Sequence, residues 1–134
     1  MANAIVGTLS VEIKNLLGLR FAAGAPILIG PGNIRHMLSR HPYEYAKYGE
    51  SIPSIVKSPD YVGINTKDGS IEYIKEYTEN REFIKAAVRA SSEGSLFVRS
   101  LYVVSGVKIL RFVNSGRLRR PPAPAHPPAQ DAKT

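Results

Sequence analysis

The alternation of apolar and polar residues is clearest in residues 83–105, where it predicts a β-hairpin. Two apolar runs, each long enough for a strand, flank the turn at residues 90–95. Gly94 can supply the positive φ that such a turn usually needs, and the neighbouring serines can hydrogen-bond to their own backbone. We therefore expect this hairpin to form the centre of the fold.

Because side chains alternate along a strand, the hairpin should have two different faces. Simple alternation places Ile84, Ala86 and Val88 on one face of the first strand, with Phe83, Lys85, Ala87 and Arg89 on the other. In the second strand it separates Phe97, Leu101 and Val103 from Val98, Ser100 and Tyr102. If the aliphatic faces pack on a helix, the opposite face carries Lys85, Arg89, Ser100 and Tyr102. That set of groups suits a phosphate, although a solvated outer face is the alternative.

The rest of the chain predicts helices first and further strands afterwards. Ser10 is a credible N-cap for a helix that ends at Gly18. Asn33 is a credible N-cap for a second helix, which ends near Arg40. A partial helix with Tyr43, Tyr45 and Tyr48 leads to an apolar stripe at Ile52, Ile55 and Val56. Strands are expected at residues 26–30, 61–65, 70–78 and 107–113, and residues 5–9 form either a strand or the entry to the first helix. The pattern predicts an α+β fold, in which N-terminal helices cover one face of an antiparallel sheet of consecutive strands.

The domain is expected to span residues 1–116. Residues 117–134 begin with Arg117, Arg119 and Arg120, and continue as a segment rich in proline and alanine. That segment has almost no apolar bulk with which to order itself, so we expect a basic, Pro-rich disordered tail.

Composition narrows the classes of function. The 134 residues suffice for one domain, and a formal net charge of +7 favours polyanionic partners such as nucleic acid. The chain has no cysteine, which excludes disulfides, thiolate catalysis and Cys-ligated zinc. No apolar run is long enough to span a membrane and no secretory signal is visible, so we expect a cytoplasmic protein without a membrane partner.

Several kinds of catalytic site lack their motifs. The glycines match neither a P-loop nor a dinucleotide fingerprint, and Ser100 lacks a nucleophile elbow. A metal site would have to draw on His36, His41 and Asp60, which have no recognised spacing, so we expect neither metal nor cofactor. Histidine, lysine, arginine, serine and tyrosine remain. These residues suit metal-independent RNA cleavage, in which a base activates the 2′-hydroxyl, cations stabilise the phosphoryl charge and an acid protonates the leaving oxygen.

One combination of motifs carries a family resemblance. The string NIRHMLSRHPYEYAKYGESIPSIVKSPDYVG, followed by SIEYIKEY, VR and FVRSLYVVSG, resembles the phage-type branch of the Barnase–EndoU–colicin–RelE nuclease superfamily. The resemblance covers roughly residues 5–116. It implies helices packed on a four-stranded antiparallel sheet whose open face cleaves RNA. It also implies catalytic roles for a helix histidine, basic strand residues and a later Ser or Thr.

Carried onto this sequence, the resemblance implies catalytic roles for His36 or His41, Lys75, Arg89 and Ser100, with Tyr102 nearby. Expected substrate contacts are Lys85, Arg99, Arg40, Tyr61 and Tyr73. Alternation places Arg99 beside Leu101, away from the basic face, and either a bulge or a strand-edge position could reconcile this. We assign the general acid or base to His36 and hold His41, which precedes Pro42 at the helix exit, as the alternate.

The leading hypothesis is a metal-independent endoribonuclease, a toxin-type effector of phage or mobile-element origin that acts on RNA, with transfer RNA as one option. The resemblance also suggests an acidic immunity protein as partner, and we expect a monomer. The competing hypotheses are a non-catalytic nucleic-acid-binding module and a protein-interaction component of a phage particle.

Overall fold

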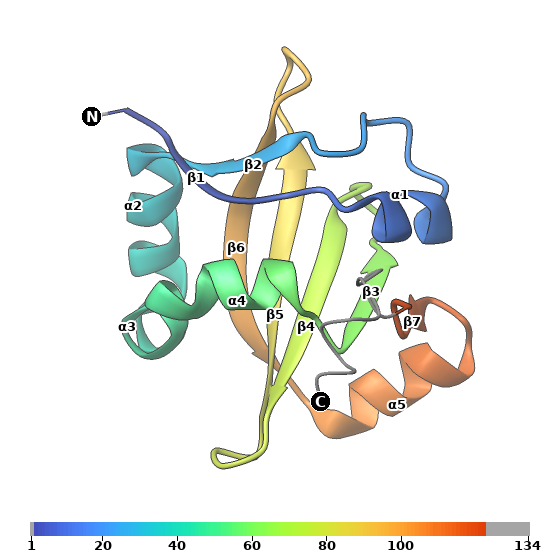
Figure 1. The fold of residues 1–134 in the computed structure, drawn as a ribbon. Helices are drawn as coiled ribbons and strands as arrows, with labels where there is room; N and C mark the ends of the chain where they lie inside the picture. The colour runs from blue at the N-terminus through green and yellow to red at the C-terminus, as the bar shows by residue number, and fades with distance from the viewer. Residues whose placement is uncertain (1, 123–134) are drawn as a thin grey trace, which may run out of the picture.

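The computed structural model describes residues 2–122, which form helices around a seven-stranded mixed sheet (Figure 1). The strands are β1 (Ala4–Thr8), β2 (Pro26–Ile29), β3 (Tyr61–Ile64), β4 (Ile71–Tyr77), β5 (Glu82–Ala90), β6 (Leu96–Val104) and β7 (Leu118–Arg119). The helices are α1 (Val11–Leu17), α2 (Pro31–Arg40), α3 (Pro42–Tyr48), α4 (Ile52–Lys57) and α5 (Gly106–Asn114), with a 3-10 turn η1 (Gly49–Ser51) before α4. Across the sheet the order is β1-β2-β6-β5-β4-β3-β7, and only β2 and β6 are parallel neighbours.

The predicted central hairpin is confirmed as β5 and β6, with Gly94 in the turn at φ 88°. Lys85 pairs with Tyr102, and Ala87 with Ser100, so these residues share a face as alternation predicts. Beyond them the register shifts, because Val88 pairs with Val98 and leaves Arg99 as the extra residue of a β-bulge.

Because of the bulge, the residues at the start of β6 lie on the opposite faces from those predicted. One extra residue exchanges the two faces of a strand, so Phe97 joins Ser100 and Tyr102, whereas Val98 joins Leu101 in the core. Simple alternation was wrong for these two residues because it cannot anticipate where an extra residue is inserted.

Helices cover one face of the sheet, which we call the helix-covered face. Ile84, Ala86, Val88 and Leu101 pack there in a cluster with Tyr73 and with residues of the covering helices, namely Met37, Tyr48, Ile52, Ile55 and Val56. Figure 1 looks onto this face, with α4 in front of the strands. The opposite face, which we call the open face, carries Glu72, Lys85, Ala87, Ser100 and Tyr102. Helix α5 packs over one end of the open face, where Ile109 meets Ile74, Val104 and Leu118.

The prediction of a strand at residues 107–113 was wrong, because this segment forms α5. Ser105 caps the helix by accepting a hydrogen bond from the backbone N–H of Lys108 at 3.2 Å. Ile109, Phe112 and Val113 then share the inward side, while Val107 and Leu110 point outward. A spacing of three and four residues fits this pattern better than alternation does.

The fold also continues past Gly116, the predicted end of the domain. Leu118 is buried, and β7 pairs with β3 at Val62 and Gly63. The sheet has β1, β2 and β7 in addition to the predicted four strands. Residues 26–30 were expected as a strand and residues 5–9 as a strand or a helix entry, whereas the two-residue edge strand β7 is too short to show alternation. Residues 123–134 of the predicted tail lie outside the described residues.

Two smaller points concern the helices. Helix α2 begins three residues earlier than expected, with Gly30 as N-cap, and the Asn33 side chain accepts a hydrogen bond from the Gly30 N–H at 2.8 Å. Among residues 2–122, no helix has the length and apolar character needed to cross a membrane.

Candidate active site

The open face contains a polar hollow with a volume of about 470 Å³, between the sheet and α5. The side chains around it come from segments distant in sequence: Asn65 and Lys67 after β3, Glu72 on β4, Lys85 on β5, Tyr102 on β6, Lys108 and Phe112 on α5, and Arg117 before β7. The lining also includes Ile74, Val103, Val104 and Ser105, so five of the twelve residues are charged, and four of the five are cationic. The hollow therefore favours an anion.

Glu72 holds two of the cations in place. Its Oε2 atom accepts hydrogen bonds from Lys85 Nζ at 2.8 Å, from Arg117 Nη2 at 2.9 Å and from Asn65 Nδ2 at 3.4 Å. The Glu72 and Lys85 side chains are 1% and 8% exposed, so the charges are compensated within the site. One carboxylate thus fixes a lysine and an arginine side by side and leaves a net positive charge.

Arg117 has unused hydrogen-bonding capacity. Its guanidinium lies 4.1 Å from the centre of the Phe112 ring, and its Nε atom is buried without a hydrogen-bond partner among the described residues. A buried donor of this kind is uncommon, and it is consistent with a site that receives an acceptor from a ligand.

Tyr102 connects this charged group to a histidine. Lys85 Nζ lies 4.6 Å from the centre of the Tyr102 ring, and the imidazole of His41 stacks on the same ring at 5.2 Å with 20° between the planes. One aromatic side chain therefore contacts both the cation and the imidazole.

His41 reaches the sheet because it sits at the junction of α2 and α3. Its backbone N–H donates to Met37 O at 2.7 Å and closes α2, while Pro42 starts α3. The Nδ1 atom lies 3.9 Å from Glu44 Oε2, which is too long for a hydrogen bond but close enough for an ion pair when the ring is protonated. Glu44 Oε2 also accepts the Val103 N–H at 3.4 Å, so this carboxylate attaches α3 to β6.

A second contact fixes α3 at its other end. Glu82, at the start of β5, accepts hydrogen bonds from the hydroxyls of Tyr43 and Tyr48 and from Lys47 Nζ. These contacts, with the Tyr48 hydroxyl first, hold the pKa of the Glu82 carboxyl below its usual value. The helix that follows His41 is therefore tied to the sheet by polar contacts at both ends.

The structure brings only some of the predicted site residues together. Tyr102 contacts both Lys85 and His41, and the Ala87–Ser100 pair lies next to the Lys85–Tyr102 pair on the same face. Arg89 follows Ser100 and Ala87 along this face and is exposed, and Arg99 is exposed at the bulge.

The other predicted residues lie elsewhere. His36 and Arg40 are exposed on α2, and Tyr73 is fully buried in the core. Lys75 follows Tyr73 on the helix-covered face and donates to Ser58 O at 2.8 Å. Tyr61 accepts a hydrogen bond from Arg120 at 3.2 Å and packs in the cluster beneath α5.

Sequence reasoning missed Glu72 and Arg117. Glu72 stands between Ile71 and Tyr73, so alternation on β4 places it on the face opposite the core, which was the available signal. Arg117 had no comparable signal, because Gly116 before it resembled the end of the domain.

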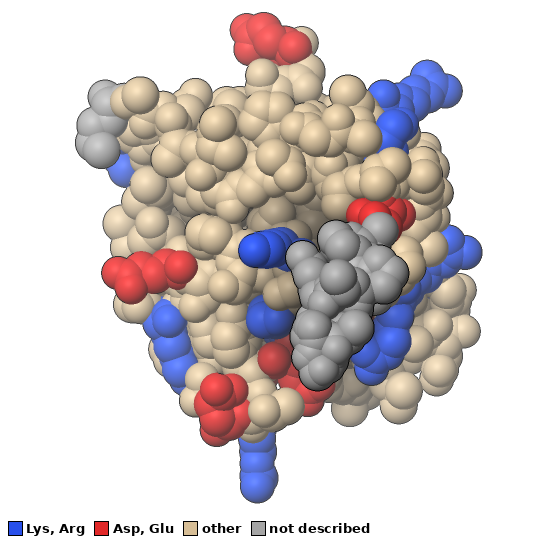
Figure 2. All heavy atoms as spheres, in the orientation of Figure 1, with Lys and Arg blue, Asp and Glu red and all other residues tan. Residues whose placement is uncertain are grey.

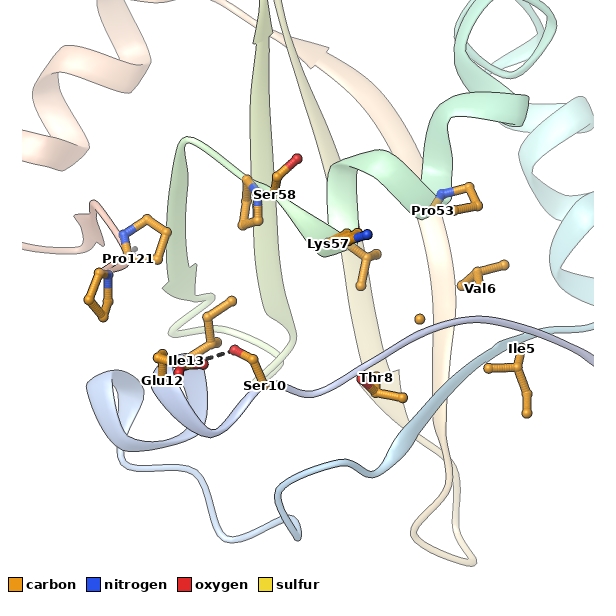
Figure 3. A pocket seen from close by; sticks show the side chains of 14 residues that line it. Ile5, Val6, Thr8, Ser10, Glu12, Ile13, Pro53, Lys57, Ser58 and Pro121 are labelled. Atoms are coloured by element: carbon orange, nitrogen blue, oxygen red, sulfur yellow. Dashed lines mark hydrogen bonds between the residues drawn. The ribbon is translucent and has the colours of Figure 1, made fainter. Parts of the chain in front are cut away.

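A second hollow on the surface is different in character (Figure 3). It has a volume of about 560 Å³ and lies among β1, α1, α4 and residues 121–122, with a largely apolar lining that includes Val6, Ile13, Pro53 and Val56. The one hydrogen bond drawn there, from Ile13 N–H to Ser10 Oγ, caps α1. Charges of both signs are scattered over the side of the molecule in Figure 2, without one dominant patch.

The family comparison agrees with these observations. The model of the family described as phage Barnase–EndoU–ColicinE5/D–RelE-like nuclease 3 matches residues 3–111. The chain belongs to this nuclease family. Searches of curated proteins and of solved structures gave no match. The matched region contains His41, Glu72, Lys85 and Tyr102, whereas Arg117 lies six residues beyond its end.

Proposed function

We propose that this nuclease is a metal-independent endoribonuclease that cleaves RNA through attack by the 2′-hydroxyl on the adjacent phosphorus. The observation that supports it most is the polar hollow in which Glu72 fixes Lys85 and Arg117, with His41 stacked on Tyr102, a residue that lines the hollow. The two fixed cations supply charge stabilisation, and the imidazole behind Tyr102 is the group available for proton transfer.

In this reaction the scissile phosphate lies in the hollow between Lys85 and Arg117. The 2′-oxygen loses its proton and forms a bond to phosphorus, and the 5′-oxygen takes up a proton as its bond to phosphorus breaks. The products are a 2′,3′-cyclic phosphate and a free 5′-hydroxyl. Lys85 and Arg117 stabilise the additional negative charge on the phosphoryl oxygens, and the Tyr102 hydroxyl is available as a further donor.

His41 exchanges a proton with one of the two reacting oxygens. This moves the acid–base role from His36 to the alternate histidine, because His36 is exposed on α2 whereas His41 stacks on Tyr102. Glu72 positions the two cations, since its Oε2 atom already accepts three hydrogen bonds.

The test is purified protein with total RNA or transfer RNA in excess EDTA over a range of pH. We expect cleavage, with cyclic phosphate at the new 3′ ends. Intact RNA together with salt-dependent binding would support the alternative, a non-catalytic nucleic-acid-binding module. Cleavage that occurs only after a divalent cation is added would contradict the metal-independent mechanism.

The biological role we propose is that of a toxin-type effector which acts as a monomer on RNA in the cytoplasm. A basic nuclease of this kind calls for an acidic partner that blocks the hollow until release. The net charge of +7, together with Lys67 and Lys108 at the hollow, supports a partner of opposite charge. An acidic protein encoded beside the nuclease is expected to abolish cleavage, and reversing the charge of Lys67 and Lys108 should weaken that inhibition.

A further inference from the structure

The open face extends beyond the polar hollow to a row of partly exposed apolar residues. Phe97 on β6 pairs with Arg89 on one side and with Leu28 of β2 on the other, and Leu28 pairs in turn with Ile5 of β1. Paired residues on neighbouring strands point to the same side, so these four side chains form a row across the sheet. We call Ile5, Leu28, Phe97 and Arg89 the upper row.

The upper row remains accessible to a ligand. Phe97 and Leu28 are half-buried, Arg89 is exposed, and Ile5 is 66% exposed. The apolar cluster beneath α5 contains none of these residues. Ile5, at the outer end of the row, also lines the apolar hollow shown in Figure 3.

The bulge in β6 is what places Phe97 here. If Arg99 took a regular place in the ladder instead of bulging out, alternation would turn Phe97 to the helix-covered face, together with Leu101. The bulge therefore keeps an aromatic ring on the open face and leaves two arginines, Arg89 and Arg99, exposed nearby. An aromatic ring with adjacent cations is the combination that binds single-stranded nucleic acid, because bases stack on the ring while cations hold phosphates.

The upper row is also continuous with the hollow. From Lys85 to Arg89 the open face passes the small pair Ala87 and Ser100, so no large side chain of these two strands interrupts it. Four residues of strand span about 13 Å, which is longer than a single nucleotide. A strand whose scissile phosphate lies at Lys85 can therefore extend along this face to Phe97.

We propose that the upper row is a second nucleotide-binding subsite, in which an unpaired base beyond the two nucleotides that flank the scissile bond stacks on Phe97 and its phosphate meets Arg89. The inference rests on the proposed function and adds to it the class of substrate. That class is single-stranded RNA, such as the loop of a folded RNA. The protein contacts more of the strand than the two nucleotides that flank the cleaved bond.

The experiment compares a cleavable dinucleotide with a hexanucleotide, using the wild type, Phe97→Ala, Phe97→Leu and Phe97→Trp. Phe97→Ala should lower kcat/KM for the hexanucleotide at least about fivefold, the smaller end of the effect of losing one base stack. It should leave the dinucleotide unaffected, since that substrate does not reach the upper row. Phe97→Leu should resemble Phe97→Ala because it keeps apolar bulk without a π face, and Phe97→Trp should resemble the wild type. Val11→Ala, at an exposed residue of α1, is the matched control.

A binding measurement separates this inference from the proposed function. A hexanucleotide with 2′-deoxyribose throughout lacks the attacking hydroxyl, so its dissociation constant reports binding alone. Phe97→Ala should weaken that binding about as much as it lowers kcat/KM. If the wild type cleaves no RNA but Phe97→Ala still weakens binding, the proposed function fails while the subsite stands.

Three results would overturn the inference. One is an equal loss for both substrates in Phe97→Ala and Phe97→Leu proteins that remain folded, which would make Phe97 purely structural. Another is an unchanged hexanucleotide rate and affinity. The third is a dimer that dissociates on Phe97→Ala or Ile5→Lys, which would assign the upper row to a second copy of the chain.

Discussion

The two faces of the central strands are built from the same stretches of sequence but perform opposite tasks. On β5, Ile84, Ala86 and Val88 face the helices and are fully buried among apolar neighbours. Between them Lys85 faces the other way and pairs with Glu72 beside an accessible hollow. The first face stabilises the fold by removing apolar surface from water, whereas the second positions charges.

The open face contains buried charged groups, while the apolar core is formed on the other face of the same strands. Glu72 is 1% exposed, yet it receives hydrogen bonds from Lys85, Arg117 and Asn65. Compensation of this kind is what makes a buried carboxylate tolerable. The helices on the far face hold the strands rigid, so the ion group on the open face keeps its geometry.

The largest expected effect is on the cleavage rate, and it is tested by comparing two lysines that lie on adjacent strands but on opposite faces of the sheet. Lys85→Met should lower the cleavage rate by roughly 100- to 1000-fold, the scale for loss of one charge-stabilising donor. Lys75→Met removes a lysine from the opposite face and should leave the rate essentially unchanged. Because Arg117 still pairs with Glu72, the Lys85 variant keeps a counter-charge and should fold. Single-turnover kinetics with circular dichroism measure both points, and equal losses in the two variants would contradict the assignment of the open face.

The second prediction concerns the two histidines. His41→Ala should slow cleavage at least ~100-fold, the usual scale for a general acid or base. His36→Ala should have no comparable effect, since that side chain is exposed on α2. The reverse outcome, in proteins with unchanged melting temperature, would restore the assignment that the sequence favoured.

A third prediction links the segment after α5 to the site. A Cβ on Gly63 would collide with the backbone carbonyl oxygen of Arg117 and approach Leu118 Cδ2 to 2.9 Å. Gly63→Ala should therefore cost about 1–3 kcal/mol of stability through overpacking, and it should slow cleavage by displacing Arg117. Gly32→Ala, on α2, meets only Arg35 Nη2 at 3.7 Å and serves as the control. Denaturant unfolding combined with kinetics tests this, and full activity in Gly63→Ala would show that Arg117 does not act in the reaction.

The smallest effect concerns the attachment of α3. The pKa of Glu82 is lowered by the Tyr48 hydroxyl and its neighbours, so its contribution to stability is present above the usual carboxyl pKa. This contribution is lost as the pH falls through the lowered pKa. Glu82→Gln should remove that part of the pH dependence, and denaturant titrations of both proteins between neutral and acidic pH measure it. Parallel stability curves for the two proteins would mean that the exposed contact contributes nothing.

Much of the scaffold could be predicted because it depends on local patterns. Ser10 and Gly18 bound α1 as expected, and the alternation in β5 placed Lys85 and Arg89 opposite the core. Local patterns failed for α5, where Val107, Ile109 and Val113 also fit a strand. The N-cap at Ser105 and the helical spacing of Ile109, Phe112 and Val113 outweighed that alternation.

The candidate site was less predictable because its members meet only through tertiary structure. The sequence by itself determined the nuclease-family pattern, the central hairpin and the face that carries Lys85, Ser100 and Tyr102. Only the tertiary structure decided that His41 stacks on Tyr102, that Arg117 returns to Glu72 and that a bulge turns Phe97 outward. The physical reason is that alternation and capping act between near neighbours in the chain. Ion pairs and ring stacking instead join residues 45 and 61 positions apart, which become neighbours only when the sheet has formed.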